Sequence, residues 1–365
     1  MNTNISSFVF KLVALTFSHL NLSQKKNLSD LIVAFFHNKS FALWEIAGGL
    51  SGETSHKHKH KRLIYFLDTL TIDINFWKSF ALTIFSLPGM EFRRRKTFTL
   101  SFDATTLKED FWLLVVSLNY QGRAIPLLVK GWEHVNQSYN YWDRVRETLS
   151  DLKAILPKGY TFEIVADRGF SGESMFNICD ELDIDFIVRI NDSYKVKLAN
   201  GKEFIQLSLF DDGYYKLEYL GQKNKRENMH LAVGTETRDG QSSTWYLVSN
   251  NAQSAKEIVN KYATRFWIEE GFKDLKSRLH WEKYTEKIPT KDRLLKSVVV
   301  SSLSYAIQTA LGNALHMSKS ERERTSLFNK FQQTFKRTTK ELEYLIMKFN
   351  SIVTKCFNRA KFAFS

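Results

Sequence analysis

The 365-residue sequence has only two cysteines, Cys179 and Cys356, and neither lies in a pattern with metal-ligand spacing. Two cysteines exclude a disulfide framework, and a reducing cytoplasm is the simplest interpretation. The first 22 residues are fairly apolar, but they lack a basic n-region and a small-residue cleavage site, and Lys11 interrupts them. We therefore expect no targeting segment.

A long uncharged stretch occurs at Ser297–Leu315, and it needs comparison with a membrane span. The stretch is rich in Ser, Gln, Thr, Asn and Gly, and basic residues lie on its N-terminal side. This composition favours a buried helix over a membrane span. We expect no membrane partner.

Acidic residues are outnumbered by basic ones, 39 against 52, which gives a net charge of +13. The surplus lies at the two ends: residues 1–96 hold 13 Lys and Arg against 6 Asp and Glu, and residues 291–365 hold 14 against 5. Residues 97–290 hold 25 against 28. Basic flanks around an acidic centre are typical of a protein that grips DNA at both ends, although a solvated basic surface has the same charge.

Residues 1–87 have the apolar spacing of helices, through Leu28–Trp44 and again through Leu63–Phe80. The glycine-rich loop between them lacks a following Gly-Lys-Ser/Thr, which argues against a P-loop. Histidine and lysine then alternate through His56–His60. Alternating histidines can ligate metal, but the intervening lysines favour the basic start of a DNA-facing helix.

From Thr97 the pattern changes to short strands interrupted by two helices. We expect, in order, strands at Thr97–Asp103, Phe111–Asn119 and Arg123–Lys130, a helix at Tyr139–Leu156, a strand at Phe162–Asp167, a helix at Glu173–Leu182 and a strand at Asp185–Ile190. This order is that of a ribonuclease-H-like α/β fold.

Residues 192–243 break this pattern and predict a β-rich insertion, which a strand at Thr244–Ser249 closes. Helices are expected again at Ala255–Lys276 and within Leu294–Phe362. The resulting domains are a helical DNA-binding region at 1–96, an α/β catalytic core at 97–290 with its insertion at 192–249, and a helical region at 291–365 for DNA-end binding or dimerisation.

Two aspartates end strands of the expected sheet: Asp103 in Ser-Phe-Asp-Ala-Thr-Thr, and Asp167 in Ile-Val-Ala-Asp-Arg-Gly-Phe. If the first strand lies at the centre of the sheet, the fourth pairs beside it and both carboxylates emerge at the same edge. A charged group at the carboxyl end of a strand suits a cleft. Taken singly, each aspartate is more simply a turn or helix-cap residue.

The expected helix at 255–276 carries a more specific pattern around Glu269. At about 100° per residue, offsets of −7, −4, +4 and +7 lie within about 40° of Glu269. The residues on this stripe are Tyr262, Arg265, Glu269, Lys273 and Lys276. A solvated face with i,i+4 ion pairs would explain the charges, but it would not explain why a tyrosine joins them.

This segment resembles a known family. The spacing Tyr-x2-Arg-x3-Glu-x6-Lys is the signature of bacterial insertion-sequence transposases of the IS-four (YREK) family, and the run that follows Ile268 looks most like the Tn-ten-type branch. Asp103 and the block Ala166–Phe170 are similar to the two Asp motifs of that family. The likeness extends from about Thr97 to Leu279, and only a short pattern after Lys61 looks familial in the N-terminal helices.

The resemblance implies a DDE active site of Asp103, Asp167 and Glu269 that holds two Mg²⁺ ions, with Mn²⁺ as a possible substitute. We expect Asp103 to bridge the metals. Glu270 is a second carboxylate beside Glu269, but it lies about 100° around the helix. The resemblance also implies cut-and-paste excision through a DNA hairpin.

DNA contacts are expected from Tyr262, Arg265, Lys273 and Lys276, which would hold phosphates near the cut. Arg168 would do likewise or form a salt bridge. Trp245 occupies the place at which the family holds a flipped base, but a core aromatic would fit the same strand position.

The expected partners are double-stranded DNA, both transposon ends and target, and a second copy of the chain in a synaptic complex. The expected location is the bacterial cytoplasm, at the nucleoid. Two other functions use the same fold: a catalytically silent DNA-binding protein, and a metal-dependent nuclease without strand transfer.

Overall fold

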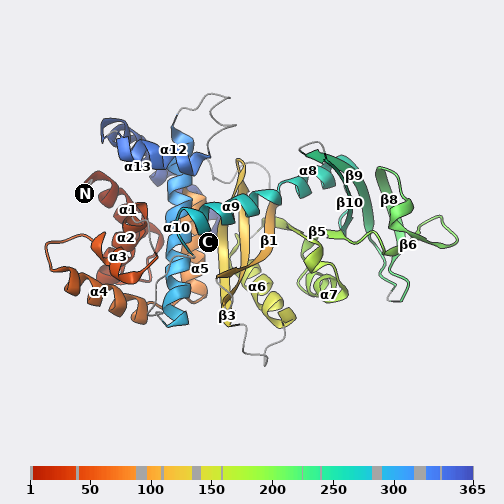
Figure 1. The fold of residues 1–365 in the computed structure, drawn as a ribbon, viewed down its shortest axis with the longest axis horizontal. Coiled ribbons are helices and arrows are strands. Elements are labelled where there is room, and N and C mark those ends of the chain that lie inside the picture. The colour runs from red at the N-terminus through yellow and green to blue at the C-terminus, as the bar shows by residue number, and fades with distance from the viewer. Residues whose placement is uncertain are drawn as a thin grey trace.

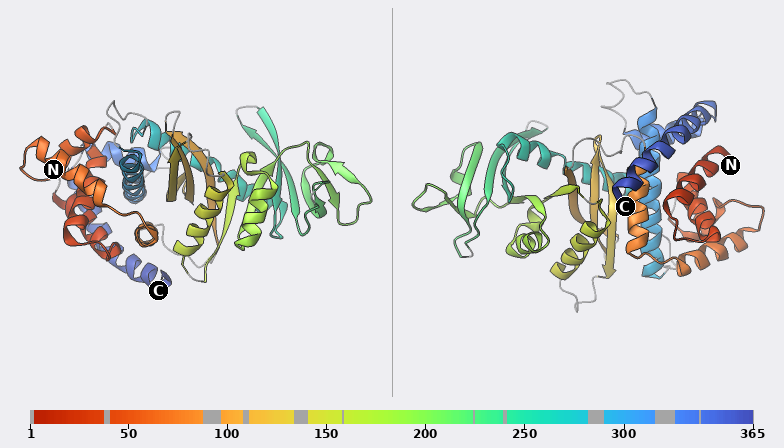
Figure 2. Two further views of the ribbon diagram at one scale, coloured as in Figure 1. Left: turned by 90° about the horizontal axis from the view of Figure 1, so that it is seen from below. Right: turned by 180° about the vertical axis from the view of Figure 1, so that it is seen from behind.

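The computed structural model describes residues 3–37, 41–87, 97–107, 111–133, 141–157, 159–223, 225–238, 241–281, 290–315, 326–337 and 339–364. Three parts follow one another along the long axis of the molecule (Figure 1). Helices from both ends of the chain form one part, a mixed sheet with its helices forms the middle, and further β-strands form the other end. Two further views show the same succession (Figure 2).

The N-terminal part is helical, as the apolar spacing predicts. Its helices are α1 (Thr3–Thr16), α2 (Leu22–His37), α3 (Leu43–Gly48), α4 (His56–Thr69) and α5 (Ile74–Ser86). The apolar residues of Leu28–Phe36 are buried, and Asp73 caps α5 by accepting a hydrogen bond from the amide of Phe76 at 2.9 Å. The expected stretch Leu28–Trp44 is two helices, α2 and α3, rather than one.

The first three strands of the core are longer than the pattern predicts, and the next two have the predicted length. They are β1 (Thr97–Leu107), β2 (Phe111–Tyr120), β3 (Arg123–Glu133), β4 (Thr161–Ala166) and β5 (Asp185–Ile190). Their order is β3-β2-β1-β4-β5; β1 is antiparallel to β2 and parallel to β4, and β4 is parallel to β5. Helix α6 (Tyr141–Ile155) precedes β4, and the 3-10 turn η1 (Arg168–Phe170) and α7 (Glu173–Glu181) follow it. This topology agrees with a ribonuclease-H-like core.

The segment expected as a β-rich insertion continues the same sheet. Its elements are β6 (Lys195–Leu198), β7 (Phe204–Gln206), the 3-10 turn η2 (Leu207–Leu209), β8 (Gly213–Leu220), β9 (His230–Arg238) and β10 (Gln241–Ser249). Strand β10 pairs with β5, so the complete order is β3-β2-β1-β4-β5-β10-β9-β8-β6-β7. The strands extend away from the helical part (Figure 1).

The C-terminal helices complete the helical part: α10 (Lys291–Ala314), α12 (Leu327–Arg337) and α13 (Thr339–Phe364). Helix α10 is long and apolar enough to span a membrane, but 94% of its most apolar window is buried inside the fold. It packs between α2 and β3, and the Ser304 hydroxyl donates to the carbonyl of Ile32 at 3.0 Å. The expectation of a buried helix is therefore met.

One expected helix, Ala255–Lys276, is broken into α8 (Ala255–Ala263) and α9 (Phe266–Ser277). At the junction the amides of Thr264 and Arg265 bond to carbonyls three residues earlier, as in a 3-10 turn. A 3-10 turn rotates the chain more per residue than an α-helix does. The prediction of one uninterrupted helix is thus wrong, and the stripe from Tyr262 to Lys276 crosses the break.

Candidate active site

The pairing of β1 with β4 places Asp103 beside Asp167. The last paired residues are Phe102 and Ala166, so the two aspartates are the next residue on each of two adjacent parallel strands. Asp103 does not end its strand as expected: β1 continues to Leu107, because β2 still pairs with it through Phe111. Only β4 ends here. The edge that the sequence predicts is therefore formed by the end of one strand beside the middle of another.

Asp167 also caps the turn that follows it. Its Oδ1 accepts a hydrogen bond from the amide of Gly169 at 2.8 Å, and Phe170 at the end of η1 packs on Phe102 with ring centroids 4.7 Å apart. The cap and the ring contact hold the aspartate against the strand that carries Asp103. Asp167 therefore caps the turn, as the simple interpretation predicts, and it also lies beside the strand that carries Asp103.

The junction between α8 and α9 brings Arg265 and Glu269 to the same place. The Arg265 guanidinium donates from Nη1 to Oδ2 of Asp103 at 3.2 Å and from Nη2 to Oε1 of Glu269. The Arg265 side chain is 9% exposed, whereas that of Glu269 is 50% exposed. One buried cation therefore joins the first and third carboxylates of the predicted triad.

The charge at Asp103 remains only partly balanced. Burial raises the pKa of Asp103 to about 6, and the neighbouring negative charges of Asp167 and Glu269 act in the same direction. Arg265 and a hydrogen bond from the Ala104 amide, at 2.8 Å, oppose that rise. A pKa raised above its ordinary value means that the ionised form is disfavoured here. A further cation would relieve this cost.

The structure does not bring the triad into a ready-made metal cluster. In the part of the chain that is described, no three His, Cys, Asp or Glu side chains are close enough together to hold an ion. The guanidinium of Arg265 supplies the positive charge between Asp103 and Glu269 instead. The donor set nevertheless suits Mg²⁺, because all three candidates are carboxylates and the raised pKa of Asp103 marks surplus negative charge.

A hydrogen-bond chain that sequence reasoning missed positions this junction. The Ser101 hydroxyl donates to Oδ1 of Asn119 at 2.7 Å, and Nδ2 of Asn119 donates to the Thr264 hydroxyl at 2.7 Å. Thr264 in turn donates to the carbonyl of Lys261 at 2.6 Å. The chain ties β1 and β2 to the residue just before Arg265. No sequence signal pairs Asn119 with Thr264, because 145 positions separate them.

Tyr141, the first described residue of α6, is a second residue that the sequence pattern did not identify. Its pKa is raised by burial and by the charges of Asp103 and Asp167. The tyrosine packs against Phe170, with ring centroids 6.3 Å apart. The hydroxyl therefore lies in the electrostatic field of the two aspartates, and it is a neutral group beside them.

Two predicted DNA contacts are buried. Tyr262 is 1% exposed and Trp245 is 2% exposed, and their rings meet edge to face with centroids 5.1 Å apart. The Phe266 ring also stacks on the Trp245 ring, with centroids 5.9 Å apart. Burial raises the pKa of Tyr262, while Arg265 and Arg189 oppose the rise. Both rings thus serve as core here, which favours the core alternative for Trp245 in this conformation.

The remaining predicted contacts lie at or near the surface. Lys273 and Arg168 are exposed, and Lys276 is partly exposed. Arg168 follows Asp167 directly, and within the described ranges no ion pair with it is recorded. Among the described residues Arg168 has no salt-bridge partner, and both alternatives for it stay predictions.

Helix α9 is anchored on its other side. Asp274 is buried and accepts from Nε of Arg123 at 2.9 Å, while Arg278 pairs with it at 3.0 Å. The Tyr305 hydroxyl of α10 lies 3.4 Å from the same carboxylate. Gly271 permits close packing, because a Cβ there would lie 2.9 Å from the carbonyl oxygen of Ala124. These contacts turn one face of α9 to the sheet.

This orientation also separates the two adjacent glutamates. Glu270 pairs with Arg123 at 3.5 Å, whereas Glu269 pairs with Arg265. The predicted choice of Glu269 agrees with these contacts. The histidine run lies elsewhere: His56 begins α4 and stacks on the Trp44 ring at 4.2 Å. Lys57 and Lys61 on the same helix are exposed.

Two comparisons with known proteins match parts of this chain. Residues 143–287 match the family model described as "Transposase DDE domain". The matched range contains Asp167 and Glu269 and begins after Asp103. A DDE domain of this kind implies a ribonuclease-H-like core, and the observed mixed sheet is consistent with that.

The chain is also similar to the "Probable transposase for insertion sequence element IS701" of Microchaete diplosiphon. The two are 26% identical over 182 residues, which cover 45% of this chain and 47% of the relative. The chain thus spans about half the length of the curated relative it matches. Both comparisons support a transposase.

Proposed function

We propose that the chain is a DNA transposase that cleaves the ends of its element and joins them to target DNA. The observation that carries this proposal is the meeting of Asp103 and Glu269 on one buried guanidinium, beside Asp167. The match of residues 143–287 to a transposase DDE domain supports it. Three carboxylates facing a polyanion would weaken a protein that only binds DNA.

Asp103, Asp167 and Glu269 are the residues that would hold divalent metal, Mg²⁺ with Mn²⁺ as a substitute. Two bound ions would activate the attacking oxygen and neutralise charge on the phosphate. Before metal binds, Arg265 keeps the first and third carboxylates together and limits their repulsion. The Ser101–Asn119–Thr264 chain holds the backbone next to Arg265, so the site is positioned from the sheet.

The protein's own cations would bind the DNA backbone around the cut. Lys273 is exposed on α9 and Lys276 partly so, one and two turns beyond Glu269, and Arg168 is exposed beside Asp167. These groups are placed to bind phosphates on either side of the carboxylates. Tyr262 is buried, so we propose that it acts by packing under Arg265 rather than by touching DNA.

The finer assignments are proposals on the resemblance to the IS-four family and its Tn-ten-type branch. They are excision through a DNA hairpin and a homodimer in the synaptic complex, at the bacterial nucleoid. Residues 1–96 and 291–365 would bind transposon ends or support the dimer, and residues 192–249 would form the insertion. A role of Trp245 with a flipped base would require the ring to leave its contacts with Tyr262 and Phe266.

The test uses purified full-length chain, Mg²⁺ and labelled DNA that carries the ends of its own element, with products resolved on denaturing gels. We expect nicks at the ends, hairpins and joined products from the wild type, and none from Asp103→Asn or Glu269→Gln. Glu270→Gln is the matched control and should remain active, because Glu270 pairs with Arg123.

Three results would contradict the proposal. Binding without cleavage in Mg²⁺ or Mn²⁺ would support a silent DNA-binding protein. Cleavage without joined products would support a nuclease. Full activity of Glu269→Gln would remove Glu269 from the site.

A further inference from the structure

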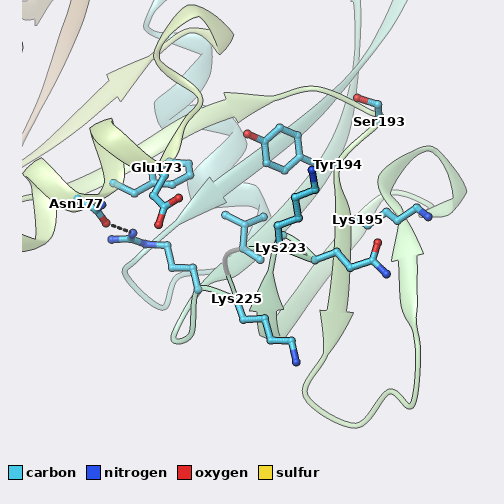
Figure 3. Close-up of a pocket in the computed structure, with 12 residues that line it drawn as sticks. Glu173, Asn177, Ser193, Tyr194, Lys195, Lys223 and Lys225 are labelled. Atoms are coloured by element: carbon cyan, nitrogen blue, oxygen red, sulfur yellow. Dashed lines mark hydrogen bonds between the residues drawn. The ribbon is translucent and has the colours of Figure 1, made fainter. Parts of the chain in front are cut away.

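A pocket lies between α7 and the strands that extend the sheet, away from the carboxylates. Its volume is about 700 Å³, within the range for pockets that bind small organic groups. Figure 3 shows Glu173 and Asn177 on one wall and Tyr194, Lys195, Lys223 and Lys225 on the others. The pocket is joined to the catalytic edge through the chain, because η1 and α7 follow Asp167 directly.

The free positive charge of this pocket comes from lysines. Arg226 also lines it, but its guanidinium is bound by Asn177 at 2.8 Å and by Asp180, and it lies over the Phe176 ring at 5.3 Å. Lys195, Lys223 and Lys225 are exposed, and among the described residues none of them has a recorded ion pair. Glu173 is the acidic residue of the lining. Lysines gathered in a concave surface concentrate positive potential.

The lysine-bearing turn is held in place by the backbone. Leu220 and Arg226 exchange amide–carbonyl bonds of 2.8 and 3.1 Å across the turn, and the Gly221 amide donates to the carbonyl of Lys195 at 3.0 Å. Lys225 also lies over the Tyr219 ring at 5.4 Å. These bonds join the two ends of the turn to each other and to Lys195, the third lysine.

The walls are not only charged. Tyr194 is partly buried against the core and lines the pocket together with Phe176 and Leu220. The Tyr194 amide donates a hydrogen bond to the carbonyl of Asn191, and the Tyr194 carbonyl accepts one from the amide of Leu207. These two bonds fix the backbone of the residue. Aromatic rings beside lysines suit an unpaired base linked to phosphates. A duplex would offer phosphates, but its bases are stacked inside.

We propose that this pocket binds a single-stranded segment of DNA, with Lys195, Lys223 and Lys225 on its phosphates and Tyr194 against a base. The proposal rests on the proposed action on DNA for the choice of DNA as ligand. It adds a second binding site that is distinct from the carboxylate centre and is built from α7, the start of β6 and the turn between β8 and β9.

The experiment measures the affinity of full-length protein for a fluorescent oligothymidylate by anisotropy, in EDTA, over a range of salt concentrations. Lys223→Gln/Lys225→Gln removes two pocket charges. The control is Lys202→Gln/Lys216→Gln, which removes two exposed lysines of the same region outside the pocket. We expect the pocket variant to bind at least about tenfold more weakly, with the slope of log K against log salt smaller by about 1.4. The control should change affinity less than about twofold.

A second pair of variants tests the stacking contact. Tyr194→Ala should weaken binding of the oligonucleotide but leave binding of an abasic strand of equal length unchanged. Tyr194→Phe keeps an aromatic ring and should bind the oligonucleotide as tightly as the wild type. Equal losses in the pocket and control lysine variants would overturn the proposal. The proposal would also be overturned if the pocket lysine variant lost as much affinity for a duplex of the same length. A third contrary result is a loss of affinity in Tyr194→Ala that is the same for the oligonucleotide and the abasic strand.

These outcomes are separate from those of the proposed function. A protein that cuts and joins DNA but ignores single strands would refute the pocket and keep the transposase. A protein that never cuts, yet binds single strands through these lysines, would do the reverse.

Discussion

Helix α9 contacts two carboxylate clusters that are balanced in opposite ways. Toward its C-terminal end, Asp274 is surrounded by two guanidinium groups, from Arg123 and Arg278, and by the Tyr305 hydroxyl. Toward its N-terminal end, one guanidinium serves both Asp103 and Glu269, and Asp167 adds a further negative charge. Burial raises the pKa of both Asp103 and Asp274.

The difference indicates what each cluster does. Arg123 and Arg278 balance the charges of Asp274 and Glu270, which suits a contact that holds helix, sheet and α10 together. Positive charge at Asp103 is too small for three carboxylates, which suits a site that awaits another cation. A carboxylate cluster is thus interpreted from its balance of charge rather than from its burial alone.

The largest expected effect is on stability at Asp274. The change Arg123→Met removes one guanidinium from the buried carboxylate of Asp274 and leaves Glu270 without its ion-pair partner. Breaking a buried ion pair costs about 3–5 kcal/mol. We expect the free energy of unfolding, measured by urea titration and circular dichroism, to fall by about that amount. An unchanged urea midpoint would remove the distinction between the two clusters.

A smaller loss is expected from Asn119→Ala, which cuts the link from Ser101 to Thr264. Leaving buried polar groups without partners costs about 1–3 kcal/mol. Because Arg265 follows Thr264, DNA cleavage at saturating DNA should slow while DNA affinity stays the same. Thr161→Val, which removes an exposed hydroxyl pair with Thr97, is the control. A parallel loss of DNA affinity would argue against a positioning role.

The pH dependence of stability tests the charge balance at Asp103. The folded pKa of Asp103 is about 6, above its ordinary value of 3.8, so its contribution to stability is present below pH 3.8 and is lost as pH rises through 6. Asp103→Asn mimics the protonated form. In EDTA it should therefore match the wild type near pH 4 and be more stable at pH 7.5, by about 3 kcal/mol.

Thermal denaturation checks this, and Mg²⁺ sharpens it. At pH 7.5 the wild type should gain stability with Mg²⁺ and Asp103→Asn should gain less, because the ionised carboxylate is the ligand. A variant that is less stable than the wild type at pH 7.5 would show that Arg265 alone balances the site.

The smallest effect is expected at Glu270. Its side chain is 46% exposed and its pair with Arg123 is 3.5 Å long, so Glu270→Gln should change the free energy of unfolding by less than about 1 kcal/mol. Cleavage should be retained. A loss of cleavage comparable to that of Glu269→Gln would mean that the two glutamates have been assigned the wrong way round.

Much of the site was predictable because it depends on local pattern. The order of strands and helices follows from the alternation of apolar residues, and the spacing around Glu269 selects one glutamate of two. Asp103 and Asp167 follow from strand patterns and parallel pairing, which is a short-range consequence of topology. The buried nature of α10 followed from its composition.

The remaining features depend on contacts between distant residues. The break at Thr264–Arg265 goes with a hydrogen bond from Asn119, and the helical pattern of the sequence cannot show a bond between such distant residues. Trp245 and Tyr262 are buried because they pack on each other, which a strand pattern and a helix pattern leave undecided.

The sequence by itself determined which residues are acidic, basic and apolar at each position, and hence the elements and the three candidate carboxylates. Only the tertiary structure decided how much positive charge each carboxylate meets. Arg265 contacts Asp103 across 162 positions, and Tyr141 enters the field of two aspartates from another helix. Charge balance depends on distance and burial in space, and neither quantity is a property of a local stretch of chain.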